Sequence, residues 1–219
     1  MKVGVLALQG DVPEHTSAVA AVVGPGRART VRRVEDLAEV DALVLPGGES
    51  TVIAALLEET GLWAALGQRL AAGFPVLGTC AGLILLAREL EPSPGGRDPP
   101  TLGALDVRVR RNEYGTQRDS FESAIEVEGV PGGPFPGVFI RAPRIVRVGP
   151  GVRVLARRGE EIVGVQQGRV MGLTFHPELS GDPRVLERFV QEAQRPRSPK
   201  ATTASAAAKR AAPARTASR

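Results

Sequence analysis

FPVLGTCAGLILLAREL, residues 74–90, joins an apolar run to a second apolar run through a turn that two glycines flank. The pattern predicts a buried strand over 74–78, a turn at 79–81 and a helix over 83–90. A strand that ends in a tight turn and passes directly into a helix is the building unit of sheets with parallel strands. The stretch therefore indicates an α/β fold.

The same strand, turn and helix pattern occurs twice more towards the N-terminus. KVGVLAL (2–8) precedes the turn QG and the helical stretch DVPEHTSAVAAVV (11–23), and DALVLPGGES (41–50) precedes TVIAALLEETGLWAAL (51–66). Strands that alternate with helices favour a doubly wound parallel sheet with helices on both faces. Because ligands bind at the carboxyl ends of such strands, we expect the turns at 9–10, 47–49 and 79–81 to share one functional edge.

The second half of the chain is richer in short β-type stretches. After the Pro/Gly loop EPSPGGRDPP (91–100), the expected strands lie in ALDVRVR (104–110), SAIEVEG (123–129), GVFIRA (137–142), VRVLARR (152–158), EIVGVQQG (161–168) and RVMGLTFHPE (169–178). They suit an antiparallel extension of the same sheet better than a separate domain. With a last helix over 183–194, we predict one flavodoxin-like, doubly wound α/β domain over residues 1–194.

The amino-acid composition limits the cellular compartment that we expect and the kinds of metal or disulfide site that the chain can form. The 219-residue chain is 42% hydrophobic, which suits one globular domain. Its single cysteine excludes an intramolecular disulfide and a cysteine-based zinc cluster, and it favours a reducing compartment. The apolar run after Lys2 is too short to span a membrane and lacks the usual layout of a signal peptide. We therefore expect a cytoplasmic protein without membrane contact.

The net charge of +4 comes from the C-terminus. Residues 195–219 carry seven Lys and Arg and no acid, so residues 1–194 hold 21 basic against 24 acidic residues. This segment is rich in Ala, Pro, Ser, Thr and Arg and has too few large apolar residues to offset its ordering entropy. We predict a solvated, disordered basic tail; a nucleic-acid-binding arm is the weaker alternative, because the segment has no aromatic residue for stacking.

Cys80 is the candidate nucleophile. A lone cysteine is usually a small buried hydrophobe, so packing is the first interpretation. The sequence Gly78-Thr79-Cys80-Ala81-Gly82 instead has the form of a nucleophile elbow, in which glycines allow the close backbone approach that a tight turn needs. At the start of a helix, Cys80 would be favoured as a thiolate and the Ala81 N–H could face an oxyanion. On this motif alone, a structural turn and a catalytic turn remain open.

His176 is the candidate base for such a cysteine. The chain has two histidines, and His176 lies at the end of an apolar strand-like run. Glu178 follows two residues later, so it could orient the imidazole as the third member of a triad. An isolated HPE motif is as often a surface feature at a strand end. His15, early in the first predicted helix, is interpreted either as a partner-facing residue or as an ordinary polar residue of a first turn, and is not counted as catalytic.

The turn LPGGES, residues 45–50, is the third candidate element. Gly47 and Gly48 would leave backbone N–H groups free for an oxyanion or for a substrate carboxylate, and Glu49 and Ser50 begin the next helix. A phosphate-binding loop is excluded because the lysine and the spacing of that motif are absent. A purely structural turn remains the alternative for this segment.

Three motifs in this order, LPGGES, GTCAGLI and FHPEL, resemble the class I glutamine amidotransferases with their Cys-His-Glu triad. The segments GVLALQGDVPEH, RNEYGTQRDSFE and GVFIRAP resemble more closely the glutaminase subunits of pyridoxal 5'-phosphate synthases, and the similarity covers about residues 1–193. This resemblance implies hydrolysis of L-glutamine to glutamate and ammonia through a cysteine thioester. The ammonia would pass through a tunnel to a synthase subunit, the expected partner in a hetero-oligomer.

The resemblance also implies roles for individual residues. Cys80 matches the nucleophile, His176 the base and Glu178 its orienting partner. Gly47, Gly48 and Ala81 are the expected oxyanion donors, and no metal or cofactor is implied. Glutamine binding falls on Gly48, Glu49, Ser50, Arg111, Ile140 and Arg141. A guanidinium suits the α-carboxylate of glutamine, whereas Arg110 should point to solvent because neighbours in a strand face opposite sides.

The chain departs from the family pattern at Thr116, where an arginine is usual, in the 92–100 loop and in the basic tail. Two other functions remain as alternatives. The glutaminase subunit of imidazole glycerol phosphate synthase has a similar triad but should lack RNEYGTQRDSFE and GVFIRAP. A redox-sensing protein with one reactive cysteine on a flavodoxin-like sheet would not need Glu178 two residues after His176.

Overall fold

Five parallel strands form one half of the main sheet. In a computed structural model that describes residues 1–93, 98–111 and 120–196, neighbouring strands run in the order β2 (Ala28–Val31), β1 (Val3–Leu6), β3 (Ala42–Leu45), β4 (Val76–Thr79) and β12 (Val170–Leu173). Every residue of β1, β3, β4 and β12 is buried, as expected for strands that are covered on both faces. The predicted parallel core is confirmed.

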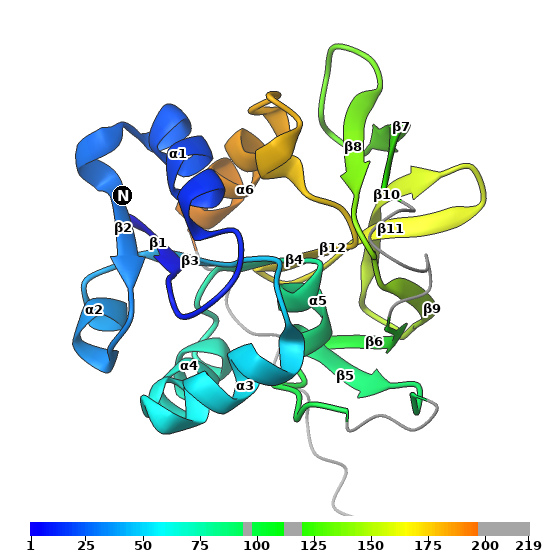
Figure 1. The fold of residues 1–219 in the computed structure, drawn as a ribbon. Coiled ribbons are helices and arrows are strands. Elements are labelled where there is room, and N and C mark those ends of the chain that lie inside the picture. The colour runs from blue at the N-terminus through cyan, green and yellow to red at the C-terminus, as the bar shows by residue number, and fades with distance from the viewer. Residues whose placement is uncertain (94–97, 112–119, 197–219) are drawn as a thin grey trace, which may run out of the picture.

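Helices cover both faces of this parallel half (Figure 1). The helices α1 (Val12–Val23) and α6 (Arg184–Gln194) pack on one face, where Val19 and Phe189 belong to a single apolar cluster. On the other face lie α2 (Val34–Ala38), α3 (Ser50–Glu59), α4 (Leu62–Ala71) and α5 (Ala81–Leu86), with Leu57, Leu66 and Leu85 in a second cluster. The doubly wound arrangement follows from these two cores.

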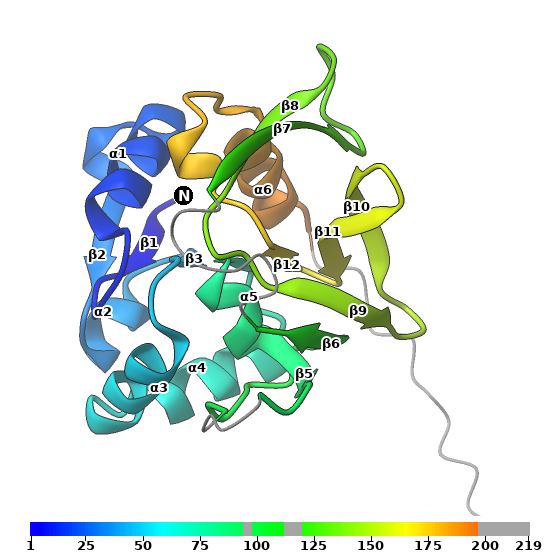
Figure 2. The ribbon, with the colours of Figure 1, turned by 45° about the vertical axis from the view of Figure 1, so that its right-hand side comes forward.

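The other half of the main sheet is antiparallel. From β12 the order continues through β11 (Glu161–Gln167), β10 (Arg153–Arg158), β7 (Phe121–Val127) and β8 (Phe135–Phe139), and each of these pairs is antiparallel. Figure 2 shows the β7–β8 hairpin at the end of the sheet that lies away from β1 and β2. The predicted antiparallel extension is therefore confirmed for these strands, while β12 itself belongs to the parallel core through its pairing with β4.

Two expectations about the middle of the chain are wrong. The helix predicted over 83–90 ends at Leu86, and β5 (Ala87–Leu90) follows it directly. The stretch 104–110 forms β6 (Leu105–Arg110), which joins β5 and β9 (Arg144–Val148) in a separate three-stranded sheet and not in the main sheet. Residues 87–90 are good helix formers, but the hydrogen bonds of β5 to β6 override that local preference. Val107 of β6 packs into the same core as α5, so the domain stays single.

Local patterns also missed some elements. The short α2 and the strands β2 and β9 were not predicted, and the stretch 51–66 is divided into α3 and α4 at Gly61, whose φ is +73°. Two 3₁₀ helices, η1 (Pro25–Arg27) and η3 (Pro177–Leu179), complete the elements that bear on the site. The last helix, predicted over 183–194, is confirmed as α6. Residues 197–219 of the predicted tail, and Thr116, lie outside the described residues.

The turn at Cys80 depends on a close contact between glycines and strand β3. A Cβ added at Gly82 would lie 2.2 Å from the carbonyl oxygen of Leu45, and one at Gly78 would lie 2.6 Å from the carbonyl carbon of Gly82. The start of α5 therefore touches the backbone of β3, which fixes where the nucleophile turn sits. Among the helices of the described residues, none has the length and apolar character needed to cross a bilayer.

We predict that Gly82→Ala lowers the free energy of unfolding by about 2 kcal/mol or more, because its Cβ must displace backbone atoms of β3. Gly67→Ala is the matched control. Gly67 lies inside α4 with no atom within 4 Å of its added Cβ, so this change should raise stability by about 0.5–1 kcal/mol. Urea unfolding of both variants tests the contact, and equal effects at the two sites would contradict it.

Candidate active site

The parallel strands bring the predicted turns to one edge. Leu173 of β12 pairs with Thr79 of β4, so Cys80 and His176 follow the ends of neighbouring strands. Gly47 follows β3 on the other side of β4, and Asp11 follows β1. The expected shared edge of the three turns is confirmed by this topology.

Cys80 occupies a strained turn between β4 and α5. Its φ of +48° lies in a region that residues other than glycine rarely adopt. Its backbone N–H donates to the carbonyl of Leu173 at 2.9 Å, and its Sγ lies 4.0 Å from the carbonyl oxygen of Ile140. The residue is 8% exposed. A nearly buried sulfur on a strained turn at the ligand edge is the arrangement of a nucleophile elbow, and simple core packing does not require it.

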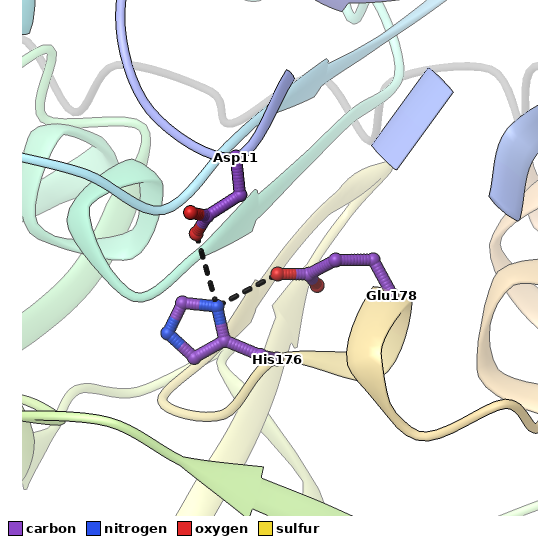
Figure 3. Close-up of side chains that lie close together, drawn as sticks. All are labelled: Asp11, His176 and Glu178. Atoms are coloured by element: carbon purple, nitrogen blue, oxygen red, sulfur yellow. Dashed lines mark hydrogen bonds and ion pairs between the residues drawn. The ribbon is translucent and has the colours of Figure 1, made fainter. Parts of the chain in front are cut away.

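His176 is held by the carboxylate of Glu178 (Figure 3). The Nδ1–H donates to Glu178 Oε1 at 2.7 Å, across the proline that begins η3. Both side chains are buried. Because Nδ1 is engaged by Glu178, Nε2 is the nitrogen available to Cys80. The geometry is that of a base whose tautomer and orientation are set by a third residue.

Asp11 is a further member of this cluster that the sequence did not reveal. Its Oδ2 lies 3.4 Å from His176 Nδ1, so two carboxylates converge on one ring nitrogen (Figure 3). The hydrogen bond with His176 lowers the pKa of Asp11, although partial burial acts in the other direction. The available signal was its position directly after the turn at 9–10, at the same sheet edge as the other two turns.

The charge on His176 follows from these neighbours. Burial by itself would lower the pKa of His176, but the neighbouring Asp11, Cys80 and Glu178 outweigh it and raise the pKa to about 12. The imidazole is therefore a cation at neutral pH, beside the ionised carboxylate of Asp11. A cation beside a cysteine sulfur stabilises the thiolate, which is the nucleophilic form.

His15 contacts both Thr79 and Glu178. It is in the first turn of α1, as predicted, but it is fully buried, and neither interpretation of the sequence anticipated its contacts. Its Nε2 lies 3.0 Å from Thr79 Oγ1 and 3.2 Å from Glu178 Oε2. Burial lowers the pKa of His15, and the attraction to Glu178 only partly opposes this. The ring is therefore neutral at neutral pH.

A small hollow of about 170 Å³ opens beside Cys80 and His176. Its volume lies below the range of about 300–1,000 Å³ that is typical for drug-sized ligands, and it suits a free amino acid better. The lining contains all six residues predicted to bind substrate. It is formed by Asp11, Gly48, Glu49, Ser50, Cys80, Ile84, Arg111, Ile140, Arg141 and His176.

Arg111 supplies a buried cation to this hollow. Its side chain is 10% exposed, and its guanidinium lies 3.3 Å from Glu49 and 3.3 Å from Asp98. The side chain of the preceding Arg110 is 45% exposed and forms an ion pair with Glu91, the residue that follows β5. The expected alternation is thus present, with Arg111 turned to the hollow and Arg110 to the surface.

The predicted oxyanion turn is held by the segment that follows β1. The N–H of Glu49 donates to Gln9 Oε1 at 2.8 Å, and the N–H of Asp11 donates to the carbonyl of Gly47 at 3.3 Å. A Cβ at Gly47 would lie 2.5 Å from Cε1 of His176. Gly47 thus lies against His176, Gly48 lines the same hollow as Cys80, and Ala81 is the first residue of α5.

Two other interpretations of this region are weaker. Donor atoms of Asp11, His176 and Glu178 lie within 4.8 Å of one another and could hold a cation. A cation there would need the Nδ1 lone pair, so it would remove the proton that Glu178 accepts and disable the base. A larger hollow of about 650 Å³ lies between α1, η3 and α6, but its lining has neither cysteine nor histidine.

Comparison with known proteins shows what the chain is similar to. The sequence profile of the SNO glutamine amidotransferase family matches residues 5–195. A Mycolicibacterium vanbaalenii protein named pyridoxal 5'-phosphate synthase subunit PdxT is 53% identical over 190 residues, which cover 86% of this chain and 96% of the relative. A protein of the same name from Geobacillus kaustophilus is 49% identical, with 87% and 93% covered.

Solved structures of similar proteins share the fold of this chain. A crystal structure of a glutamine amidotransferase has a TM-score of 0.80 and 47% identity, and the match covers 88% of this chain and 99% of that one. The structure of PurLQS from Thermotoga maritima has a TM-score of 0.55 at 16% identity, with 88% of this chain and 98% of that one covered. This second match shows a shared fold only.

The neutral, buried His15 predicts a pH-dependent stability. Below its ordinary pKa of 6.5, the unfolded chain takes up a proton that the folded chain refuses, so the free energy of unfolding falls with falling pH. The contribution of this one group is at most about 1.4 kcal/mol per pH unit. Asp11 acts in another range, because its lowered pKa affects stability only below about 3.8.

We expect His15→Gln to remove this contribution. Urea unfolding of both proteins between about pH 7 and pH 5 should give a smaller loss of stability for the variant. His176 is unchanged in both proteins and cancels in the difference. Parallel stability profiles would contradict a neutral His15.

Proposed function

Since the chain belongs to the SNO glutamine amidotransferase family, we propose that Cys80, His176 and Glu178 are the triad with which it hydrolyses L-glutamine to glutamate and ammonia. The observation that carries the proposal is the 2.7 Å bond from His176 Nδ1 to Glu178 Oε1, beside a hollow that contains Cys80 and the predicted substrate residues. A redox sensor with one reactive cysteine would need neither the oriented base nor the hollow.

The chemistry then follows from the positions of the groups. The Cys80 thiolate attacks the side-chain amide carbon of glutamine, and backbone N–H groups of Gly48 and Ala81 stabilise the oxyanion, with Gly47 shaping the turn. His176 gives its proton to the leaving nitrogen, so ammonia departs and a thioester remains. Water then attacks the thioester, His176 takes the proton from that water, and glutamate leaves with Cys80 restored.

Buried carboxylates keep His176 in its working state. The carboxylate of Glu178 is fully buried and accepts the Nδ1 proton, so it stabilises the imidazolium without exchanging with water. Asp11, half-buried at the rim of the hollow, places a second carboxylate 3.4 Å from the same nitrogen. The cation can therefore form and give up its Nε2 proton within a fixed geometry.

Arg111 is the proposed partner of the substrate's α-carboxylate. A nearly buried guanidinium binds a carboxylate through paired hydrogen bonds, and Glu49 and Asp98 already hold it in place. Glu49 and Ser50 start α3 at the rim, while Ile140 and the Arg141 backbone, with φ of +42°, form the opposite wall. The substrate's side chain then points to Cys80.

The names of the relatives supply the proposed partner. Because two of the similar proteins are named subunits of pyridoxal 5'-phosphate synthase, we propose a synthase subunit that receives the ammonia through a tunnel in a hetero-oligomer. We also propose a cytoplasmic location, since the Cys80 thiol must stay reduced to react. Residues 1–194 would form the catalytic domain and 195–219 a separate tail.

The first test is glutamate release from L-glutamine by the full chain, with and without the synthase subunit. We expect weak activity alone, stimulation by the partner, and loss of activity in Cys80→Ala. Full activity without the partner would contradict the dependence on the partner. No hydrolysis with the partner present would overturn the triad and favour the redox sensor.

A second test separates binding from chemistry. Arg111→Lys should raise the KM for glutamine roughly tenfold with a smaller effect on kcat, because lysine cannot reproduce the paired hydrogen bonds. Arg110→Lys is the control and should leave KM unchanged, since Arg110 faces away from the hollow. A similar KM in the two variants would rule out Arg111 as the carboxylate-binding residue.

A further inference from the structure

We propose that His15 is a positioning residue of the triad, which holds Glu178 through the carboxylate oxygen that His176 does not use. The proposal rests on the proposed function, because it assigns Glu178 the orienting role. Oε1 of Glu178 accepts from His176 at 2.7 Å, and Oε2 lies 3.2 Å from Nε2 of His15. In Figure 3 the second oxygen of Glu178 is turned away from Nδ1 of His176.

Both members of this contact are shut off from water. The side chains of His15 and Glu178 are each 0% exposed. A buried carboxylate with one oxygen lacking a donor carries a desolvation penalty, and its two oxygens can exchange by rotation. A donor held 3.2 Å from Oε2 reduces both problems and favours the orientation in which Oε1 faces His176.

The protonation of His15 follows from its surroundings. Glu178, His176, Asp11 and Glu14 are the charged or titratable groups around it, and burial keeps the ring neutral. A neutral imidazole carries one proton, and Nε2 is hydrogen-bonded to Thr79 Oγ1 and lies 3.2 Å from Glu178 Oε2. Within the described residues, neither Nδ1 of His15 nor Oε2 of Glu178 has a hydrogen-bond partner. This fits an unprotonated Nδ1 and leaves Nε2 of His15, at 3.2 Å, as a donor within reach of Oε2. His15 is therefore assigned as an Nε2–H donor.

His15 also connects two elements of the site. It lies on α1, while Thr79 is the last residue of β4 and directly precedes Cys80. Thr79 Oγ1 is 3.0 Å from Nε2, slightly closer than the carboxylate. The competing interpretation is that His15 serves only to hold Thr79 and has no part in orienting Glu178.

Three variants distinguish these roles. The amide nitrogen of Gln reaches the place of Nε2 in histidine, whereas the shorter Asn ends near the place of Nδ1 and leaves Oε2 without a donor. His15→Gln should therefore retain function and His15→Asn should lose it. Thr79→Val removes the competing hydroxyl at nearly constant volume and leaves the contact with Glu178 in place.

Two measurements are made on each variant. The first is kcat and KM for glutamine in the complex with the synthase subunit. The second is the pH dependence of Cys80 alkylation by iodoacetamide in the isolated full chain, which reports the thiolate and imidazolium pair without any turnover. A thermal unfolding midpoint for each variant separates loss of fold from loss of positioning.

We expect His15→Asn to lower kcat by roughly 10- to 100-fold, as is typical when the outer partner of a functional side chain is removed, with KM unchanged. Its alkylation profile should move to higher pH by about one unit, because Glu178 no longer holds the His176 cation. His15→Gln and Thr79→Val should match the wild type in both measurements.

Other results overturn the proposal. A folded His15→Asn with wild-type kcat and alkylation profile would show that Glu178 needs no donor from His15. A loss in Thr79→Val equal to that in His15→Asn would assign His15 to Thr79. If His15→Asn does not fold, a loss in folded His15→Gln would decide against the proposal. Absence of Cys80-dependent hydrolysis in the wild type would instead refute the proposed function.

Discussion

The parallel pairing of β4 with β12 is the constraint on which the site depends. Leu173 lies opposite Thr79, so the residues that leave these two strands, Cys80 and His176, emerge side by side although they are far apart in the chain. The N–H of Cys80 donates to the carbonyl of Leu173, which ties the turn at Cys80 to the strand that leads to His176. The second requirement is the glycine contact of α5 with β3, because it lets the turn lie close to the neighbouring strand end.

Burial and charge are balanced differently at the two histidines, and this gives them opposite states. His176 meets two carboxylates and the cysteine, so hydrogen bonding outweighs desolvation and the ring is a cation. His15 is buried as deeply but shares only the far oxygen of Glu178, so desolvation prevails and the ring is neutral. One buried carboxylate thus lies between a cationic and a neutral imidazole, and its hydrogen bond goes to the cationic His176.

The parts of the fold that the sequence predicted are those with a local signal. Continuous apolar runs marked β1, β3 and β4, and the motifs around Cys80 and His176 marked the site, because strand ends in a parallel sheet share one edge. The parts it missed depend on contacts between distant segments. Residues 87–90 have a local preference for helix, but their pairing with β6 makes them a strand. No local pattern predicts the contact of His15 with Glu178 of η3 or that of Asp11 with His176. Burial of a polar residue is a property of the assembled fold.

The segment after β1, residues 9–11, packs tightly against the turn at 47–49, the proposed oxyanion turn. A Cβ at Gly10 would lie 1.8 Å from the carbonyl oxygen of Gly47, and the side chain of Gln9 accepts the N–H of Glu49. Asp11 adds a bond to Gly47 and a charge beside His176. The start of α1 therefore cannot move without displacing the turn at 47–49, and His15 lies one helical turn further along the same helix. The proposed nucleophile, base and oxyanion turn thus share one rigid support, since residues 9–15 contact each of them or the residue beside it.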